Sequence, residues 1–130
     1  MKLDEYESWN EVISKEQFSF LINELILKEN NYSNSEILER LEILSEKYLK
    51  FYDLDYLTKI QRQNVNKILI KLTDFSNLTT IEELIGVLFN LKIDEYYHYL
   101  KRHSDTIISK QVEKEVFESL KEYEETLKQV

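Results

Sequence analysis

Apolar residues recur every three or four positions along most of the chain, which is the spacing of helices that bury one face. No segment alternates apolar and polar residues with a period of two for long enough to predict a strand. The pattern predicts six or seven helices, at about residues 4–13, 14–29, 33–52, 57–72, 79–92 and 94–103, and from Ser104 or Ser109 to Leu127.

Signals for helix starts precede several of these segments. In a capping box, a Ser or Thr side chain and a Glu or Gln three residues later each bond the other's backbone N–H. The predicted boxes are Ser14–Gln17, Ser33–Glu36 and Thr79–Glu82, and Asp94 is predicted to cap the helix that it opens. The stripes assign to inward faces, among others, Leu41, Leu49, Ile60, Leu69, Leu88, Phe117 and Leu127.

Turn-forming residues are scarce, because the chain has one glycine and no proline. Sandwiches and barrels need such residues in many turns, so the composition also favours helices. Gly86 lies inside a predicted helix, where the missing side chain is predicted to let two helices approach closely.

We therefore expect an all-α fold, a single domain over residues 1–130, built as a stack of antiparallel helical hairpins. Residues 33–52 and 57–72 are expected to form one hairpin, and residues 79–92 and 94–103 a second. The final helix closes the stack. This arrangement is compatible with a short solenoid of HEAT type.

The expected location of the protein rests on three features that the sequence lacks. The chain has no cysteine, and therefore no disulfide framework, thiolate metal site or thiol nucleophile. Its first residues carry acids where a secretory signal has an apolar core. The longest apolar stretch, residues 84–89, is far shorter than the roughly 20 residues of a membrane-spanning helix. We expect a cytoplasmic protein with no membrane segment.

The net charge of −8 is unevenly distributed. Residues 1–55 hold 13 acidic and 6 basic residues, residues 56–110 hold 6 and 8, and residues 111–130 hold 6 and 3. Nucleic-acid binding relies on Lys and Arg against phosphates, so this balance predicts no nucleic-acid partner. An acidic surface can instead attract a basic protein, or it can serve solubility alone.

Residues that could carry catalysis are few. His98 and His103 are the only histidines, and their spacing of five sets them about 140° apart on a helix. The motif Glu95-x-x-His98 matches one half of a di-iron carboxylate site, but the sequence holds no second copy. We therefore expect no enzyme activity, no cofactor and no bound metal.

Acidic residues cluster without the pattern of a known site. The segment that starts at Asp53-Leu54-Asp55 lacks the glycine and the closing glutamate of a calcium loop. The adjacent carboxylates Glu82–Glu83 and Glu124–Glu125 are expected on polar faces, where nothing raises a pKa.

Contacts with a protein partner are predicted in three places. Tyr99 ends a run of four consecutive rings and is expected near the surface, where aromatic residues anchor partners. It could instead only cover a neighbouring helix. The acidic candidates lie at the break after the third helix and on one face of the last helix: Asp53, Asp55, Glu115, Glu118, Glu122 and Glu125. The last four could also form a solvated face paired with nearby lysines.

Residues 79–108, TTIEELIGVLFNLKIDEYYHYLKRHSDTII, combine a charged helix start, an apolar helix, the link Leu91-Lys92-Ile93-Asp94 and a tyrosine-rich amphipathic helix. This stretch resembles the all-helical immunity proteins of bacterial polymorphic toxin and contact-dependent inhibition systems, in particular the family catalogued as immunity protein 30. The resemblance implies a cytoplasmic antidote that binds one cognate toxin and blocks it by occlusion. Many such toxins are basic nucleases, which suits an acidic partner.

Other functions remain open at this point. The chain could be a phage-encoded protein inhibitor or nucleic-acid mimic, or a non-catalytic helical adaptor subunit.

Overall fold

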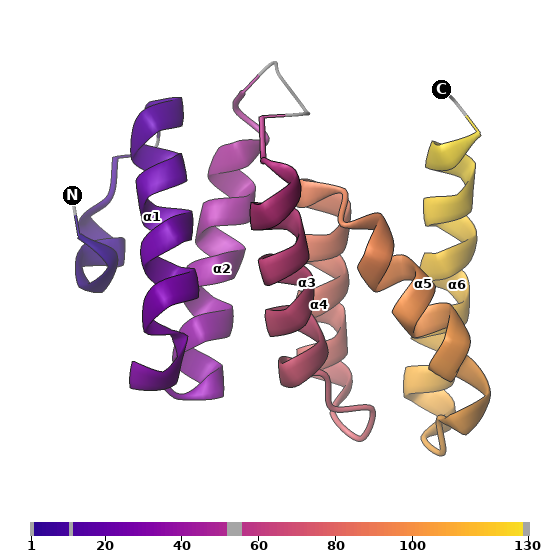
Figure 1. Ribbon diagram of the computed structural model, residues 1–130. Coiled ribbons are helices and arrows are strands. Elements are labelled where there is room, and N and C mark those ends of the chain that lie inside the picture. Colours follow the sequence, from indigo (N-terminus) through magenta and orange to yellow (C-terminus); the bar gives the residue numbers. More distant parts are fainter. Residues whose placement is uncertain (1, 11, 52–55, 129–130) are drawn as a thin grey trace.

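The structure is a computed structural model that describes residues 2–10, 12–51 and 56–128, and over these residues it is helical with no strand (Figure 1). The α-helices are α1 (Lys15–Lys28), α2 (Asn34–Tyr48), α3 (Lys59–Leu72), α4 (Leu78–Leu91), α5 (Asp94–His103) and α6 (Lys110–Leu127). Short 3₁₀ segments are η1 (Leu3–Ser8), η2 (Glu29–Asn31) and η3 (Ser104–Thr106). The all-α prediction is confirmed.

The helices alternate between two layers. α1, α3 and α5 pack side by side in one layer, and α2, α4 and α6 pack side by side in the other. Each connection crosses from one layer to the other, so helices two apart along the chain become neighbours that run in the same direction (Figure 1). The predicted hairpin of residues 33–52 with 57–72 is therefore wrong, because α2 packs mainly against α4 and α1. This alternation is typical of α-solenoids.

Two of the predicted capping boxes are present, and a third that was not predicted opens α3. In each, the side chain of the first residue accepts a bond from the backbone N–H three positions on, and the reciprocal bond is also made. The boxes are Ser14–Gln17, Ser33–Glu36 and Thr58–Gln61.

The predicted N-caps of α4 and α5 are wrong by two residues and by one residue, although α5 spans the predicted residues 94–103. Asn77 caps α4, and its side chain accepts a bond from the N–H of Thr80 (3.1 Å), so Thr79 lies inside the helix. Ile93 occupies the N-cap position of α5. Asp94 is then the first helical residue, and its carboxylate accepts a hydrogen bond from the hydroxyl of Tyr123.

The core is formed by the inward faces of all six α-helices, and Leu41, Leu69 and Leu88 are buried in it as predicted. The inward assignment is wrong at the edges of the stripes. Ile60 lies in the first turn of α3, and Leu49 and Leu127 lie at helix ends, where solvent reaches them. Phe117 directly follows the buried Val116, and the helical rotation of about 100° per residue turns it outward.

Gly86 is exposed, and a β-carbon added there would have no heavy atom within 4 Å. The predicted close approach of helices at Gly86 is therefore wrong. Among the described helices, none is both long and apolar enough to cross a membrane.

The N-terminal segment packs against α2 as a 3₁₀ turn followed by extended backbone, and not as the helix predicted over residues 4–13. Trp9 is buried there, and its indole N–H donates to the carbonyl of Lys2 (2.9 Å). The central contact is Arg40 of α2, which is buried between the rings of Tyr6 and Tyr32, each 4.5 Å from the guanidinium carbon.

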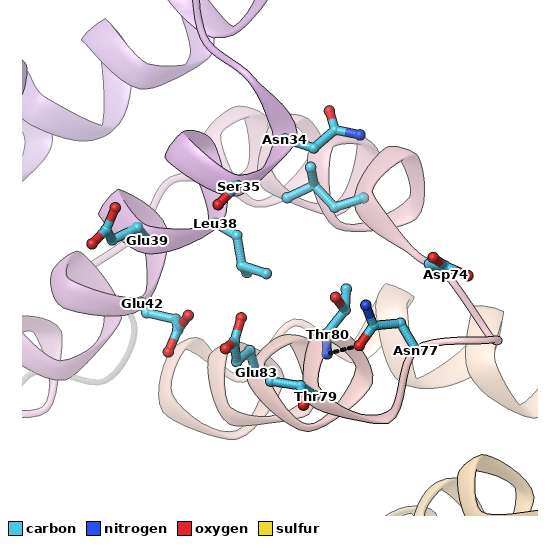
Figure 2. A pocket seen from close by; sticks show the side chains of 11 residues that line it. Asn34, Ser35, Leu38, Glu39, Glu42, Asp74, Asn77, Thr79, Thr80 and Glu83 are labelled. Atoms are coloured by element: carbon cyan, nitrogen blue, oxygen red, sulfur yellow. Dashed lines mark hydrogen bonds between the residues drawn. The ribbon is translucent and has the colours of Figure 1, made fainter.

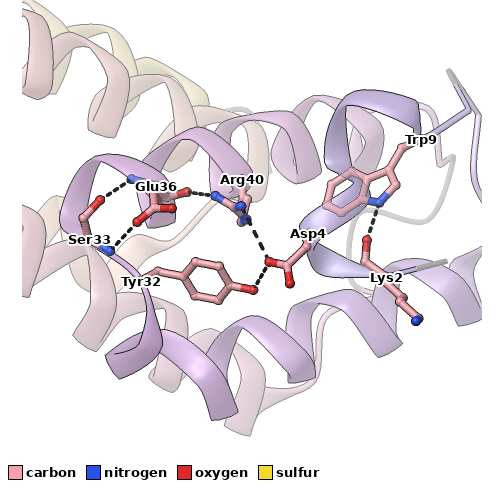
Figure 3. Close-up of polar contacts among 7 residues, drawn as sticks. All are labelled: Lys2, Asp4, Trp9, Tyr32, Ser33, Glu36 and Arg40. Carbon is pink, nitrogen blue, oxygen red and sulfur yellow. Dashed lines mark hydrogen bonds and ion pairs between the residues drawn. The ribbon is translucent and has the colours of Figure 1, made fainter.

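Polar contacts fix the orientation of Arg40 (Figure 3). Its Nη1 donates to the carbonyl of Glu36 (3.0 Å), and its Nη2 lies 3.8 Å from the carboxylate of Asp4, which also accepts a bond from the hydroxyl of Tyr32. The guanidinium therefore faces the N-terminal segment, on one side of α2.

Candidate functional site: an acidic groove between α2 and α4

A groove of about 650 Å³ separates the first turns of α2 and α4, which begin at the same end of the stack (Figures 1 and 2). Leu38 and Leu72 give it an apolar floor, and the side chains of Ser35, Thr79 and Thr80 line its walls.

Four carboxylates surround this groove. Glu39 and Glu42 come from successive turns of α2, Glu83 comes from α4, and Asp74 comes from the turn between α3 and α4. Figure 2 shows the carboxylates of Glu42 and Glu83 pointing toward each other across the groove.

The groove continues along α2 and α4 into a smaller hollow of about 230 Å³, and Glu42 and Glu83 line both. The hollow adds the carboxylates of Glu46 and Glu82. We call the two together the acidic groove, defined by Glu39, Glu42, Glu46, Asp74, Glu82 and Glu83. Within the part of the chain that the structure describes, no Lys, Arg or His lines either part of it.

The clearest electrostatic consequence is at Glu42. Partial burial, followed by the charge of Glu83 and a hydrogen bond with it, raises the pKa of the Glu42 carboxyl from 4.5 to about 7. Glu46 and Glu39 add further repulsion. The carboxyl with the raised pKa thus belongs to Glu42 of α2, which the sequence did not single out, and the fold places it against Glu83 of α4.

The cations of α2 face away from the acidic groove. Arg40 is held by the N-terminal segment, as described above, and the ammonium of Lys47 donates to the backbone carbonyl of Asn10 (2.5 Å). These contacts with the N-terminal segment keep the positive charges of Arg40 and Lys47 away from Glu39, Glu42 and Glu46 on the same helix.

Asp74 has a fixed position at the other edge of the groove. Its Oδ1 accepts bonds from the backbone N–H (3.0 Å) and the hydroxyl (2.5 Å) of Ser76. These two bonds lower the pKa of Asp74, so the carboxylate stays charged in the turn.

The structure does not bring the predicted contact residues together into one site. Asp53 and Asp55 lie outside the described residues. Tyr99 is half-buried, stacks on Tyr96 with ring centroids 5.8 Å apart, and packs against His103 at 4.5 Å. Since the hydroxyl of Tyr96 lies 2.8 Å from that of Thr73, these rings occupy the flank of α5 that faces α3.

The stripe of Glu115, Glu118, Glu122 and Glu125 lies on α6, whereas Tyr99 lies on α5. Two of its carboxylates have partners on the same helix: Glu115 accepts a bond from the hydroxyl of Ser119 (3.3 Å), and Glu125 lies 3.6 Å from Lys128. Glu118 and Glu122 are exposed. Two of the four carboxylates of the stripe thus have a hydrogen-bonding or oppositely charged neighbour close by in the sequence.

Neither histidine is placed with acidic residues in a way that suggests a metal site. His98 is exposed beside the ring of Tyr97, and His103 packs against Tyr99. Over the described ranges, the acidic groove included, no three His, Cys, Asp or Glu side chains converge to hold a metal ion.

Sequence reasoning missed the acidic groove, although part of its signal was present. Glu39, Glu42 and Glu46 are spaced by three and four, like the stripe of α6. What the sequence did not provide was the pairing of α2 with α4. Comparison with family models, with curated proteins and with solved structures finds no match to this chain.

Proposed function

We propose that this chain binds a basic protein by taking up its Lys or Arg side chains in the acidic groove, and that it blocks this partner by occlusion, as an immunity protein does. The observation that carries the proposal is the set of six carboxylates that line one groove without a described Lys, Arg or His among them. Glu42 and Glu83 repel each other across the groove, so a partner's cation placed between them would relieve that repulsion.

The biological half of the proposal is supported by the resemblance of residues 79–108 to immunity proteins. The groove adds a means of recognition, since five of its six carboxylates project from the adjacent helices α2 and α4 of a packed layer and need little reordering when a partner binds. The proposal includes a cytoplasmic location, because an antidote must meet its toxin where the toxin acts.

The test is binding to the product of the gene adjacent to its own, co-expressed and purified as a complex, with association rates measured at low and high salt. Changing Glu42 and Glu83 together to Gln should lower the association rate about tenfold at low salt, and the difference should shrink at high salt. The matched control changes Glu118 and Glu122 to Gln, which removes nearly the same charge from exposed positions of α6 when both pairs are compared at about pH 8, where Glu42 is mostly ionised.

Two results would count against the proposal. Equal losses in both double variants would mean that net charge and not the groove matters. Tight binding to duplex DNA or RNA, unaffected by either pair of changes, would replace a protein partner with a nucleic acid. In cells, the Glu42 and Glu83 double variant should also protect poorly against the toxin while it remains folded.

A further inference from the structure

A second hollow, largely apolar, lies at the end of the stack where α4 and α6 begin. It encloses about 460 Å³ between the turn that joins α3 to α4 and the segment that joins η3 to α6. Ile108 is 95% exposed there, and Phe75 is half-buried. We call it the apolar hollow, defined by Phe75, Ser76, Thr106, Ile108 and Ser109.

The hydroxyl groups that line the apolar hollow are already used within the protein. Each makes a local hydrogen bond: Ser76 donates to Asp74 (2.5 Å), Thr106 donates to the carbonyl of His103 (2.7 Å), and Ser109 accepts from the N–H of Val112 (3.4 Å) as the cap of α6. What the hollow offers a ligand is therefore mainly the hydrocarbon surface of Phe75 and Ile108. Its occupant should be apolar.

The apolar hollow adjoins the acidic groove through a single turn. Asp74 lines the groove, and the next residue, Phe75, lines the hollow. The bonds from Ser76 to Asp74 hold both in place. On the other side, the exposed Asp105 lines a separate hollow together with Lys110 and Lys114, so the uncompensated negative charge beside the apolar hollow lies on the side of Asp74 and the acidic groove.

We propose that the apolar hollow receives an apolar side chain from the same basic partner whose Lys or Arg side chains enter the acidic groove. This inference rests on the proposed function and specifies the partner further: its bound segment carries an apolar residue with basic residues beside it. The charge of Asp74 and the continuity with the acidic groove select this occupant over a neutral small molecule. The aliphatic surface of Ile108 and the ring of Phe75 would supply affinity, while the carboxylates would supply the orientation.

The test uses two fluorescent oligolysine peptides of equal length, one with a central leucine and one with a central glycine. With the unchanged protein, the leucine peptide should bind about tenfold more tightly, since part of the leucine side chain is removed from water. Ile108→Ser should abolish this preference and leave the affinity for the glycine peptide unchanged. Ile108 is exposed, so this change should leave the fold intact. The matched control is Ile60→Ser, at an exposed apolar position in the first turn of α3, at the opposite end of the stack (Figure 1).

The outcomes separate this inference from the proposed function. If both peptides bind equally and both lose affinity when Glu42 and Glu83 become Gln, the acidic groove stands and the inference about the apolar hollow is overturned. A leucine preference that survives Ile108→Ser, or that disappears equally in Ile60→Ser, also overturns it. If changing Glu42 and Glu83 to Gln alters neither the affinity for the peptides nor the salt dependence of that affinity, the proposed function itself fails.

Discussion

Replacing Glu42 with Gln should make the protein more stable at alkaline pH, although the change removes a charged surface residue. Glu42 faces the carboxylate of Glu83 across the acidic groove, and the two share a hydrogen bond when Glu42 is protonated (Figure 2). The glutamine side chain would have similar size and could still donate a hydrogen bond to Glu83. It would not, however, gain a negative charge as the pH rises.

The sign follows from the pKa of Glu42, which is 4.5 in an ordinary setting and about 7 in the folded protein. Between these two values the folded state holds a proton that the unfolded state has lost, so folding stability falls as the pH rises through this window. A shift of this size in a fully buried site would correspond to about 3 kcal/mol. Glu42 is only partly buried, and solvent screening reduces the expected effect to about 1 kcal/mol.

The assay is urea denaturation followed by circular dichroism at about pH 5 and about pH 8, for the unchanged protein and the variant. At each pH, the free energy of unfolding of the unchanged protein is subtracted from that of Glu42→Gln. This difference should be about 1 kcal/mol larger at about pH 8 than at about pH 5. Glu118→Gln, which removes one exposed carboxylate of α6 outside the acidic groove, is the matched control. A difference that does not vary with pH, or that varies equally in the control, would refute the placement of Glu42 against Glu83.

Three further changes test other parts of the structure. Gly86→Ala should raise the free energy of unfolding by about 0.5–1 kcal/mol in urea denaturation, because the position is exposed, helical and open around the added carbon. A lower free energy of unfolding would instead mean that another helix lies close to Gly86. Leu41→Ala or Leu88→Ala should each lower it by about 2–5 kcal/mol, since both side chains are buried, and losses under about 1 kcal/mol would contradict that burial. Arg40→Ala should cost about 2 kcal/mol through lost contacts with two tyrosine rings, and should shift the fluorescence of Trp9, the one tryptophan, as the N-terminal segment loosens; unchanged emission would place that segment's anchor elsewhere.

Helix positions could be predicted from the sequence because they depend on neighbours three and four residues apart. The stripes through Leu41, Leu69 and Leu88 and the boxes at Ser14 and Ser33 are local patterns, and the structure confirms them. The predictions were wrong where a stripe ends, or where two nearby residues could each cap the same helix. At α4, for example, both Asn77 and Thr79 offer a cap, and the helix begins after the earlier one.

The acidic groove could not be predicted, because it depends on which helices are neighbours and where the cations of α2 go. Glu42 and Glu83 are far apart in the sequence, and they meet only because α2 packs on α4 and not on α3. Arg40, one residue after Glu39, would be expected to neutralise part of the groove. Instead its guanidinium is buried between tyrosine rings, and no feature of a single sequence indicates this.

The repulsion that lowers the stability of the free protein should also drive its binding, and this gives the two processes opposite dependences on pH. A lysine side chain placed between Glu42 and Glu83 would stabilise the charged form of both carboxyls, so binding should release the proton that Glu42 holds near neutral pH. Lysine keeps its own charge up to about pH 10, so oligolysine affinity should rise several-fold between about pH 6 and about pH 8. Over the same interval the free protein should lose stability, and Glu42→Gln should weaken both trends. An oligolysine affinity that is constant over this range would mean that the cation contacts exposed carboxylates, such as those of α6, and does not enter the acidic groove.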